Sequence, residues 1–195
     1  MTALALDTVT SQHARIQELS RIFAGLFLGI IVLYALWCAL IMISAVDNPY
    51  LHGSLGPTGG KLFLGEPPPL PADFVPIPSL PIWHRLFFLV VFVAAQAPFF
   101  MVFANVRALF QLYARGVVFA ADNARRFKLT GLWLIAAAIA PALSQVVQRG
   151  AGLAIDRAWF HMWEVHALIL GGLLFVISLV MEVGREIEQE RAEFV

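Results

Sequence analysis

Long runs of apolar residues without any charged side chain alternate with shorter polar stretches along this chain. The four runs cover residues 22–46, 86–106, 129–148 and 165–181. Each is near or above the ~20 residues that a helix needs to cross a bilayer. Only helices and closed barrels satisfy their backbone polar groups inside lipid. The pattern therefore predicts an all-α membrane protein with four transmembrane helices in a single domain, residues 1–195.

Two polar stretches flank these runs at the chain ends. Residues 1–21 place Ile16 and Leu19 at helical spacing beside charged residues, which predicts a short interfacial helix. Residues 182–195 are rich in Glu and Arg, and opposite charges at i, i+3 spacing such as Glu188 and Arg191 support an exposed helix. We therefore expect a helical tail after the fourth span.

The stretch between the first two spans, residues 47–85, has a different composition. It holds nine of the eleven prolines of the chain. Proline lacks a backbone N–H and fixes its own φ angle, so it is compatible with polyproline-like extension but not with helices or central strands. We expect a semi-ordered loop without regular structure.

The stretch between the second and third spans, residues 107–128, is short and basic. It carries five of the thirteen Lys and Arg residues. Its length fits a hairpin between two membrane helices, and Gly116 lies where the first of these must end, a position at which glycine often adopts the left-handed conformation. We therefore predict a helical hairpin with its turn at Gly116.

The overall composition agrees with a membrane protein. Hydrophobic residues make up 60% and charged residues 13% of the chain, whereas soluble proteins have about 25% charged residues. The formal net charge is zero, so nothing predicts direct binding of nucleic acid. The lone Cys38 lies inside the first span and cannot form an internal disulfide.

The distribution of positive charge predicts the orientation. With four spans, nine Lys and Arg residues fall on the side of the termini and the 107–128 hairpin, and four fall on the other side. Positively charged loops are retained in the cytoplasm. Both termini and the hairpin are therefore predicted to be cytoplasmic, and the proline-rich loop to lie outside.

No arrangement of residues in the chain indicates catalysis. Ser-His-Asp combinations, phosphate-binding glycine loops and paired intramembrane acids are absent from the sequence, and no Asp, Glu, Lys or Arg lies near the middle of a span. We expect no enzyme, no cofactor and no ion-coupled transport. Five polar or proline residues inside the spans indicate either helix kinks with hydrogen-bonded amides or a substrate path: Gln96, Pro98, Pro141, Ser144 and Gln145.

The cytoplasmic hairpin and tail combine aromatic residues with charges, as many interfaces do. These residues pack between helices or dock a cytoplasmic protein. The candidate docking residues are Phe110, Tyr113, Gly116, Phe119, Arg125, Arg126, Glu186, Glu188 and Glu190. Gly25 and Gly29 form a Gly-x-x-x-Gly pair, which allows close packing of a helix within the chain or in a homo-oligomer.

The histidines offer a different function. His52, His84, His161 and His166 fall on the outer side near Asp156 and Glu164. Imidazole and carboxylate groups bind zinc and copper. An outer metal or haem module is therefore the alternative to a docking protein, although the i, i+5 spacing of His161 and His166 puts them on different faces of a straight helix.

The hairpin sequence LFQLYARGVVF, followed by Asn123, and the end of the last span resemble a known family. This is domain of unknown function 2975, a family of small four-span bacterial membrane proteins. Its characteristic residues match here at Tyr113, Gly116, Phe119, Glu182, Gly184 and Glu188. The resemblance implies a multi-pass protein of the bacterial inner membrane without enzymatic activity, and members often lie beside genes for small helix-turn-helix regulators. Ala120 departs from the Ser or Thr helix cap usual in the family.

Overall fold

The structure is a computed structural model, and it describes most of the chain. Described are residues 2–47, 49–56, 59–69, 74–117, 120–152 and 162–193. Side chains are described for residues 14–47, 49–55, 61–69, 74–117, 120–152, 162–185 and 187.

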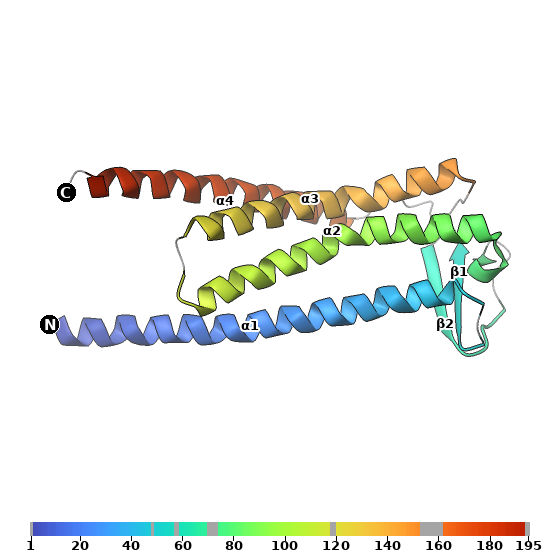
Figure 1. The fold of residues 1–195 in the computed structure, drawn as a ribbon, viewed down its shortest axis with the longest axis horizontal. Coiled ribbons are helices and arrows are strands. Elements are labelled where there is room, and N and C mark those ends of the chain that lie inside the picture. Colours follow the sequence, from blue (N-terminus) through green and yellow to red (C-terminus); the bar gives the residue numbers. More distant parts are fainter. Residues whose placement is uncertain are drawn as a thin grey trace. The chain divides into compact units, whose positions relative to one another are not determined.

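Four long helices and a small sheet make up the described chain (Figure 1). The helices are α1 (Thr2–Ser44), α2 (Ile82–Ala114), α3 (Ala121–Gly150) and α4 (Met162–Glu193). The strands are β1 (Leu51–Gly56), β2 (Gly59–Leu64) and β3 (Val75–Pro76), and a short 3-10 helix, η1 (Ile77–Ser79), follows β3.

Each helix contains a stretch long and apolar enough to cross a membrane, which confirms the four predicted spans. These stretches are Ala14–Ser44, Ile82–Ala114, Ala121–Gly150 and Met162–Arg185. Their number, length and composition are those of a multi-pass membrane protein. Residues 2–21 are helical as predicted, but they do not form a short helix of their own, because α1 continues from Thr2 into the span without a break. No glycine or proline occurs before Gly25 to interrupt it.

The chain divides into two compact units, and every helix contributes to both. Unit 1 comprises Met1–Ile31, Phe99–Ile135 and Leu168–Val195, and unit 2 comprises Val32–Pro98 and Ala136–Ala167. The cytoplasmic hairpin predicted from the sequence belongs to unit 1, and the proline-rich segment belongs to unit 2. We describe each unit by itself.

In unit 1, α3 and α4 touch through two glycines. A Cβ built on Gly131 would lie 2.6 Å from the carbonyl oxygen of Gly171, and one built on Gly171 would lie 2.8 Å from that of Gly131. Small residues allow such close approach of membrane helices. The same two helices are joined by an ion pair between Lys128 Nζ and Glu182 Oε1, 3.7 Å apart.

Aromatic stacking holds α1 against α2 in unit 1. The ring centroid of Phe110 lies 5.1 Å from that of Phe23 and 5.7 Å from that of Phe27, with nearly parallel planes. Tyr113 meets Phe110 edge-on at 6.4 Å. Such pairs contribute about 0.5–1.5 kcal/mol beyond their burial.

The turn between α2 and α3 confirms the predicted role of Gly116, which has a φ of 80°. The Gly116 N–H donates to the Tyr113 carbonyl and the Val117 N–H to the Leu112 carbonyl. This pair of bonds is the Schellman arrangement that ends many helices. Asn123, a fully buried residue in the first turn of α3, joins this helix to the turn, because its Nδ2 donates to the Val117 carbonyl at 2.9 Å.

Unit 2 corrects the expectation of a proline-rich loop without regular structure. β1 pairs with β2 in an antiparallel hairpin and with β3 on its other side, in the order β2-β1-β3. The pairing is compatible with the prolines because β1 and β2 contain none of them: most lie from Pro67 onward. β3 and η1 occur within the proline-rich part itself, with Pro76 at the sheet edge.

A small core in unit 2 joins this sheet to the helices. It contains Ala45, Leu55, Ile77 and Phe88, all less than a tenth exposed. Gly53 on β1 lies against the end of α1, because a Cβ there would stand 2.5 Å from Ser44 Oγ. Glycine at this position lets the strand approach the helix end.

Close packing of Gly25 and Gly29 within the chain, one of the two interpretations of this pair, is wrong. Both residues are exposed, and a Cβ built on either would meet no described atom within 4 Å. The close helix contact instead uses Gly131 and Gly171. The other interpretation of this pair, packing in a homo-oligomer, stays a prediction.

Candidate functional site

A cavity of about 300 Å³ lies in unit 2. Its wall comes from the last turns of α1, the β1–β2 hairpin, η1, the start of α2 and the end of α3. Trp37, Phe88 and Phe92 give it a largely apolar surface. Pockets of this size, apolar with a few polar groups, are typical of sites for small molecules.

One face of α3 supplies most of the polar wall. Pro141, Ser144, Gln145 and Gln148 all line the cavity. Their i, i+3, i+4, i+7 spacing places them on the same face of a helix. Gln96 of α2 also lines the cavity. The sequence had indicated Gln96, Pro141, Ser144 and Gln145 as kink residues or path residues, and the structure brings these four together.

Some polar groups of the wall are hydrogen-bonded within the chain. Ser44 Oγ donates to the Ile41 carbonyl and Ser144 Oγ to the Pro141 carbonyl, both at 2.7 Å. The Tyr34 hydroxyl donates to Gln96 Oε1. The two serine bonds lie within a single helix, whereas the Tyr34–Gln96 bond joins α1 to α2, so among these groups Gln96 agrees with the interpretation of a hydrogen-bonded amide at a helix contact.

Three other oxygens of the wall have no partner among the described residues. They are Ser54 Oγ, Gln145 Oε1 and Gln148 Oε1. Ser54 is 1% and Gln148 5% exposed, so water reaches their side chains poorly. An unsatisfied buried polar group costs about 1–3 kcal/mol.

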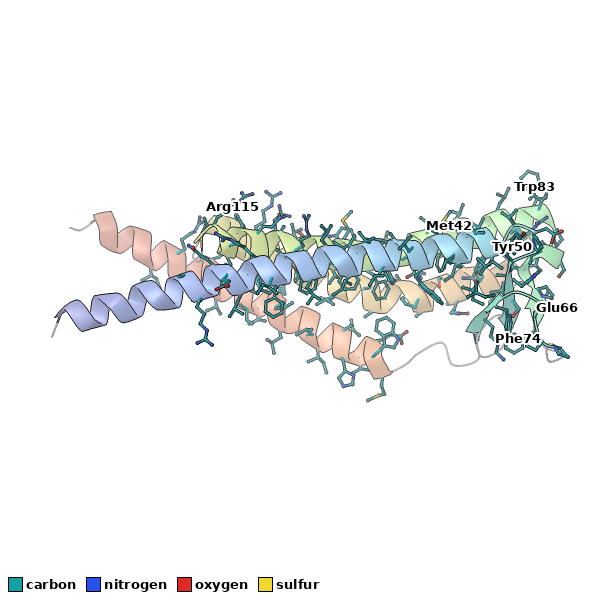
Figure 2. The ribbon with its side chains drawn as sticks, turned by 90° about the horizontal axis from the view of Figure 1, so that it is seen from below. Met42, Tyr50, Glu66, Phe74, Trp83 and Arg115 are labelled. Atoms are coloured by element: carbon teal, nitrogen blue, oxygen red, sulfur yellow. The ribbon has the colours of Figure 1, made fainter. Side chains whose placement is uncertain are left out.

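The charge of the cavity comes from Lys61 on β2. It is the charged residue among the described lining residues. Its ammonium group lies 4.3 Å from the ring centroid of Phe74, a buried residue next to the sheet (Figure 2). Ser54 and Lys61 could not be predicted as cavity residues, because residues 47–85 were expected to lack regular structure. Gln148 could have been predicted, because it follows Gln145 by three residues and so lies on the same face of the helix.

A second hollow, of about 180 Å³, lies in unit 1 beside the α2–α3 turn, where Figure 2 shows Arg115. We call it the arginine hollow. Its lining residues are Ala108, Gln111, Leu112, Arg115, Asp122, Arg125 and Arg126. Arg125 and Arg126 were predicted docking residues, and they lie here together with Arg115. Three guanidinium groups against one carboxylate make the hollow basic.

Arg126 is held in place by α2. Its Nη1 donates to Asn105 Oδ1 at 3.0 Å, and Asn105, 5% exposed, donates through Nδ2 to the Met101 carbonyl at 2.7 Å. Thr130 Oγ1 donates to the Arg126 carbonyl at 2.8 Å. Arg115 and Arg125 are exposed, so they are accessible to a ligand.

The other predicted docking residues are placed differently. Phe110 and Tyr113 form the aromatic cluster with Phe23 and Phe27, so they pack within unit 1. Gly116 forms the turn. Phe119 and the side chains of Glu186, Glu188 and Glu190 lie outside the described part of the chain.

The described histidines form no metal centre with other described residues. No group of three His, Cys, Asp or Glu side chains is found there at ligand distance. His166 Nδ1 lies 2.7 Å from the Met162 carbonyl. His161 and Asp156 lie outside the described residues.

Comparison with known proteins gives one match. A family model described as "Protein of unknown function (DUF2975)" matches residues 69–195, which include α2, α3 and α4. α1 precedes the matched residues. No curated protein and no solved structure matches the chain. Since the match covers more than half of its residues, the chain belongs to the DUF2975 family.

Proposed function

We propose that this protein is a non-enzymatic regulatory protein of the bacterial inner membrane that docks an acidic segment of a cytoplasmic protein in the arginine hollow. The observation that carries the proposal is the gathering of Arg115, Arg125 and Arg126 around one hollow. Arginine binds carboxylates through paired, charge-assisted hydrogen bonds.

The orientation needed for this function rests on charge. Nine of the thirteen Lys and Arg residues lie on the side of the hairpin and both termini, which favours a cytoplasmic location for the hollow. Within unit 1, the beginning of α1, the α2–α3 turn and the end of α4 lie at the same end (Figure 1). This arrangement is the one required for termini and hairpin on the same side.

The chemistry of the docking surface differs from that expected from the sequence. Phe110 and Tyr113 pack α2 against α1, so they are not the residues that anchor the partner. In this proposal the arginines bind the partner's carboxylates instead. Arg126 is fixed through Asn105 and thus loses little conformational entropy on binding, which favours affinity. Arg115 and Arg125 supply exposed charge.

A small helix-turn-helix regulator is the partner that the family resemblance suggests. Binding at the membrane would keep such a regulator from its operator. A membrane signal that changed the affinity by a few kcal/mol would be enough to shift the bound population. An acidic segment on the regulator would supply the charge that complements the hollow.

The test uses the full chain in native membranes. Chemical crosslinking and affinity purification should recover a soluble protein that contains an acidic segment. Arg115→Glu combined with Arg125→Glu should abolish its recovery, because charge reversal repels carboxylates. Arg15→Glu combined with Arg21→Glu is the matched control, since these exposed α1 residues do not line the hollow and the net charge changes equally.

The purified partner then has to bind the protein in nanodiscs of phosphatidylcholine. We expect binding that weakens with salt and is competed by a poly-glutamate peptide. Loss of recovery in both charge-reversal variants, or binding that requires anionic lipid and no partner, would refute docking in the hollow. The latter outcome would identify the hollow as a lipid head-group site.

A further inference from the structure

We propose that the unit 2 cavity binds a small amphipathic molecule with an apolar body and a neutral or anionic hydrogen-bonding head group. This site is separate from the docking function, because every lining residue of the cavity belongs to unit 2 and every lining residue of the arginine hollow to unit 1. The proposal rests on the shape, polarity and charge of the cavity.

The apolar part of the wall defines the body of the ligand. Leu55, Ile77 and Phe88 are core residues that also line the cavity, and Phe92 and Trp37 extend the same surface. Transfer of apolar surface from water to such a wall contributes about 25 cal/mol per Å². An alkyl chain or a small ring system fits a wall of this kind.

The unpartnered oxygens define the head group. Ser144 and Gln96, in the same wall, are satisfied within the chain, whereas Ser54 Oγ, Gln145 Oε1 and Gln148 Oε1 are not. Ser54 and Gln148 are each more than nine-tenths buried. Gln145 Oε1 and Gln148 Oε1 only accept hydrogen bonds, and Ser54 Oγ can donate or accept, so these oxygens suit a head that donates, such as a hydroxyl, an amide or a protonated carboxyl. An ionised carboxylate would bind through donors, which Ser54 Oγ and the Lys61 ammonium group supply.

The charge of the wall selects between head groups. Lys61 gives the described lining residues a single positive charge, with no carboxylate to balance it. A cationic head would be repelled, and a neutral or anionic head would be accepted. The cavity should therefore discriminate by charge among molecules with the same apolar body.

The experiment uses the full chain in phosphatidylcholine nanodiscs and a photoreactive diazirine derivative of dodecanoate. We expect saturable labelling of peptides that contain Phe88 and Phe92. Excess dodecanoate or dodecanol should compete, and dodecyltrimethylammonium should compete at least about tenfold less well, which corresponds to ~1.4 kcal/mol. Labelling that rises in proportion to probe concentration, or equal competition by the cation, would overturn the proposal.

Neighbouring alanines on α2 provide a matched pair of variants. Ala95 is buried and lines the cavity, whereas Ala94 is exposed and does not. Ala95→Phe should fill the cavity and abolish saturable labelling, and Ala94→Phe should leave it intact. Labelling of Ala95→Phe at the wild-type level would contradict a site in this cavity.

A second variant remains informative if Ala95→Phe fails to fold. Gln148→Leu removes an amide oxygen that has no partner among the described residues, so it should raise the unfolding temperature without probe and weaken competition by dodecanol about fivefold, the loss of one hydrogen bond. A purely structural amide would give a lower unfolding temperature and unchanged competition. That result would show that Gln148 Oε1 is hydrogen-bonded to the protein or to water and not to the ligand.

Discussion

The backbones of Gly131 and Gly171 meet so closely that a Cβ on either would stand within 3 Å of the carbonyl oxygen of the other. The neighbouring atom is backbone in both cases, so a side chain there can be accommodated only if the helices move apart. This contact and the Lys128–Glu182 ion pair fix α3 against α4 in unit 1.

Gly131→Ala and Gly171→Ala should therefore destabilise the protein. Overpacking of a close contact costs about 1–3 kcal/mol, and the unfolding temperature in mild detergent should fall accordingly. Gly172→Ala is the control, because a Cβ at Gly172 meets no described atom within 4 Å. Equal unfolding temperatures for Gly131→Ala and Gly172→Ala would show that the helices are not in contact there.

Gly29→Leu should leave the stability of a single chain unchanged, since the space around Gly29 is open among the described residues. A thermal unfolding curve in detergent measures this directly. Size-exclusion chromatography with light scattering on the same samples tests the homo-oligomer. A smaller oligomer for Gly29→Leu would show that a second copy packs on Gly25 and Gly29, whereas a lower unfolding temperature at constant mass would contradict the open face.

Phe110→Ala should lower stability by more than about 1 kcal/mol, because two stacked pairs and one edge-on pair are lost with it. Met101→Ala, on the same helix but 45% exposed, is the comparison and should change little. Thermal unfolding measures both. Release of a bound partner by Phe110→Ala at unchanged stability would instead support the prediction that Phe110 is a docking residue.

The orientation can be tested with cysteines in a Cys38→Ser background. Ser79 and Ala121 are both exposed, and Ser79 follows the sheet while Ala121 begins α3. An impermeant thiol reagent applied to cells with a permeabilised outer membrane should label Ser79→Cys and spare Ala121→Cys. Labelling of Ala121→Cys alone would invert the orientation.

The helices could be predicted from the sequence because membrane spans depend on composition alone. A run without charge and of sufficient length has few alternatives in lipid, and Gly116 marked the end of α2 correctly. Helix ends were less predictable. α1 extends to Thr2 because polar residues continue a helix as readily as apolar ones when glycine and proline are absent.

The sheet and the cavity could not be predicted because they depend on pairing between distant residues. The high proline content of residues 47–85 as a whole predicted irregular structure, although the strands β1 and β2 within it contain no proline. The register of the β1–β2 hairpin pairs Leu51 with Leu64. Ser54 and Lys61 reach the cavity wall only through this register. Polar residues of α3 were visible in the sequence, but nothing in it showed that Gln145 Oε1 and Gln148 Oε1 would have no partner among the described residues while Gln96 Oε1 would have one.

The boundary of the family match divides the residues that line the cavity into two groups. Phe88, Gln145 and Gln148 lie within residues 69–195, whereas Trp37, Ser54 and Lys61 precede them. The glutamine wall lies inside the matched residues and Lys61 lies outside them, so the hydrogen-bonding groups of α3 and the positive charge of the proposed ligand site come from different parts of the chain. A truncated chain that begins at residue 69 would keep the amides and lose the charge that discriminates between head groups.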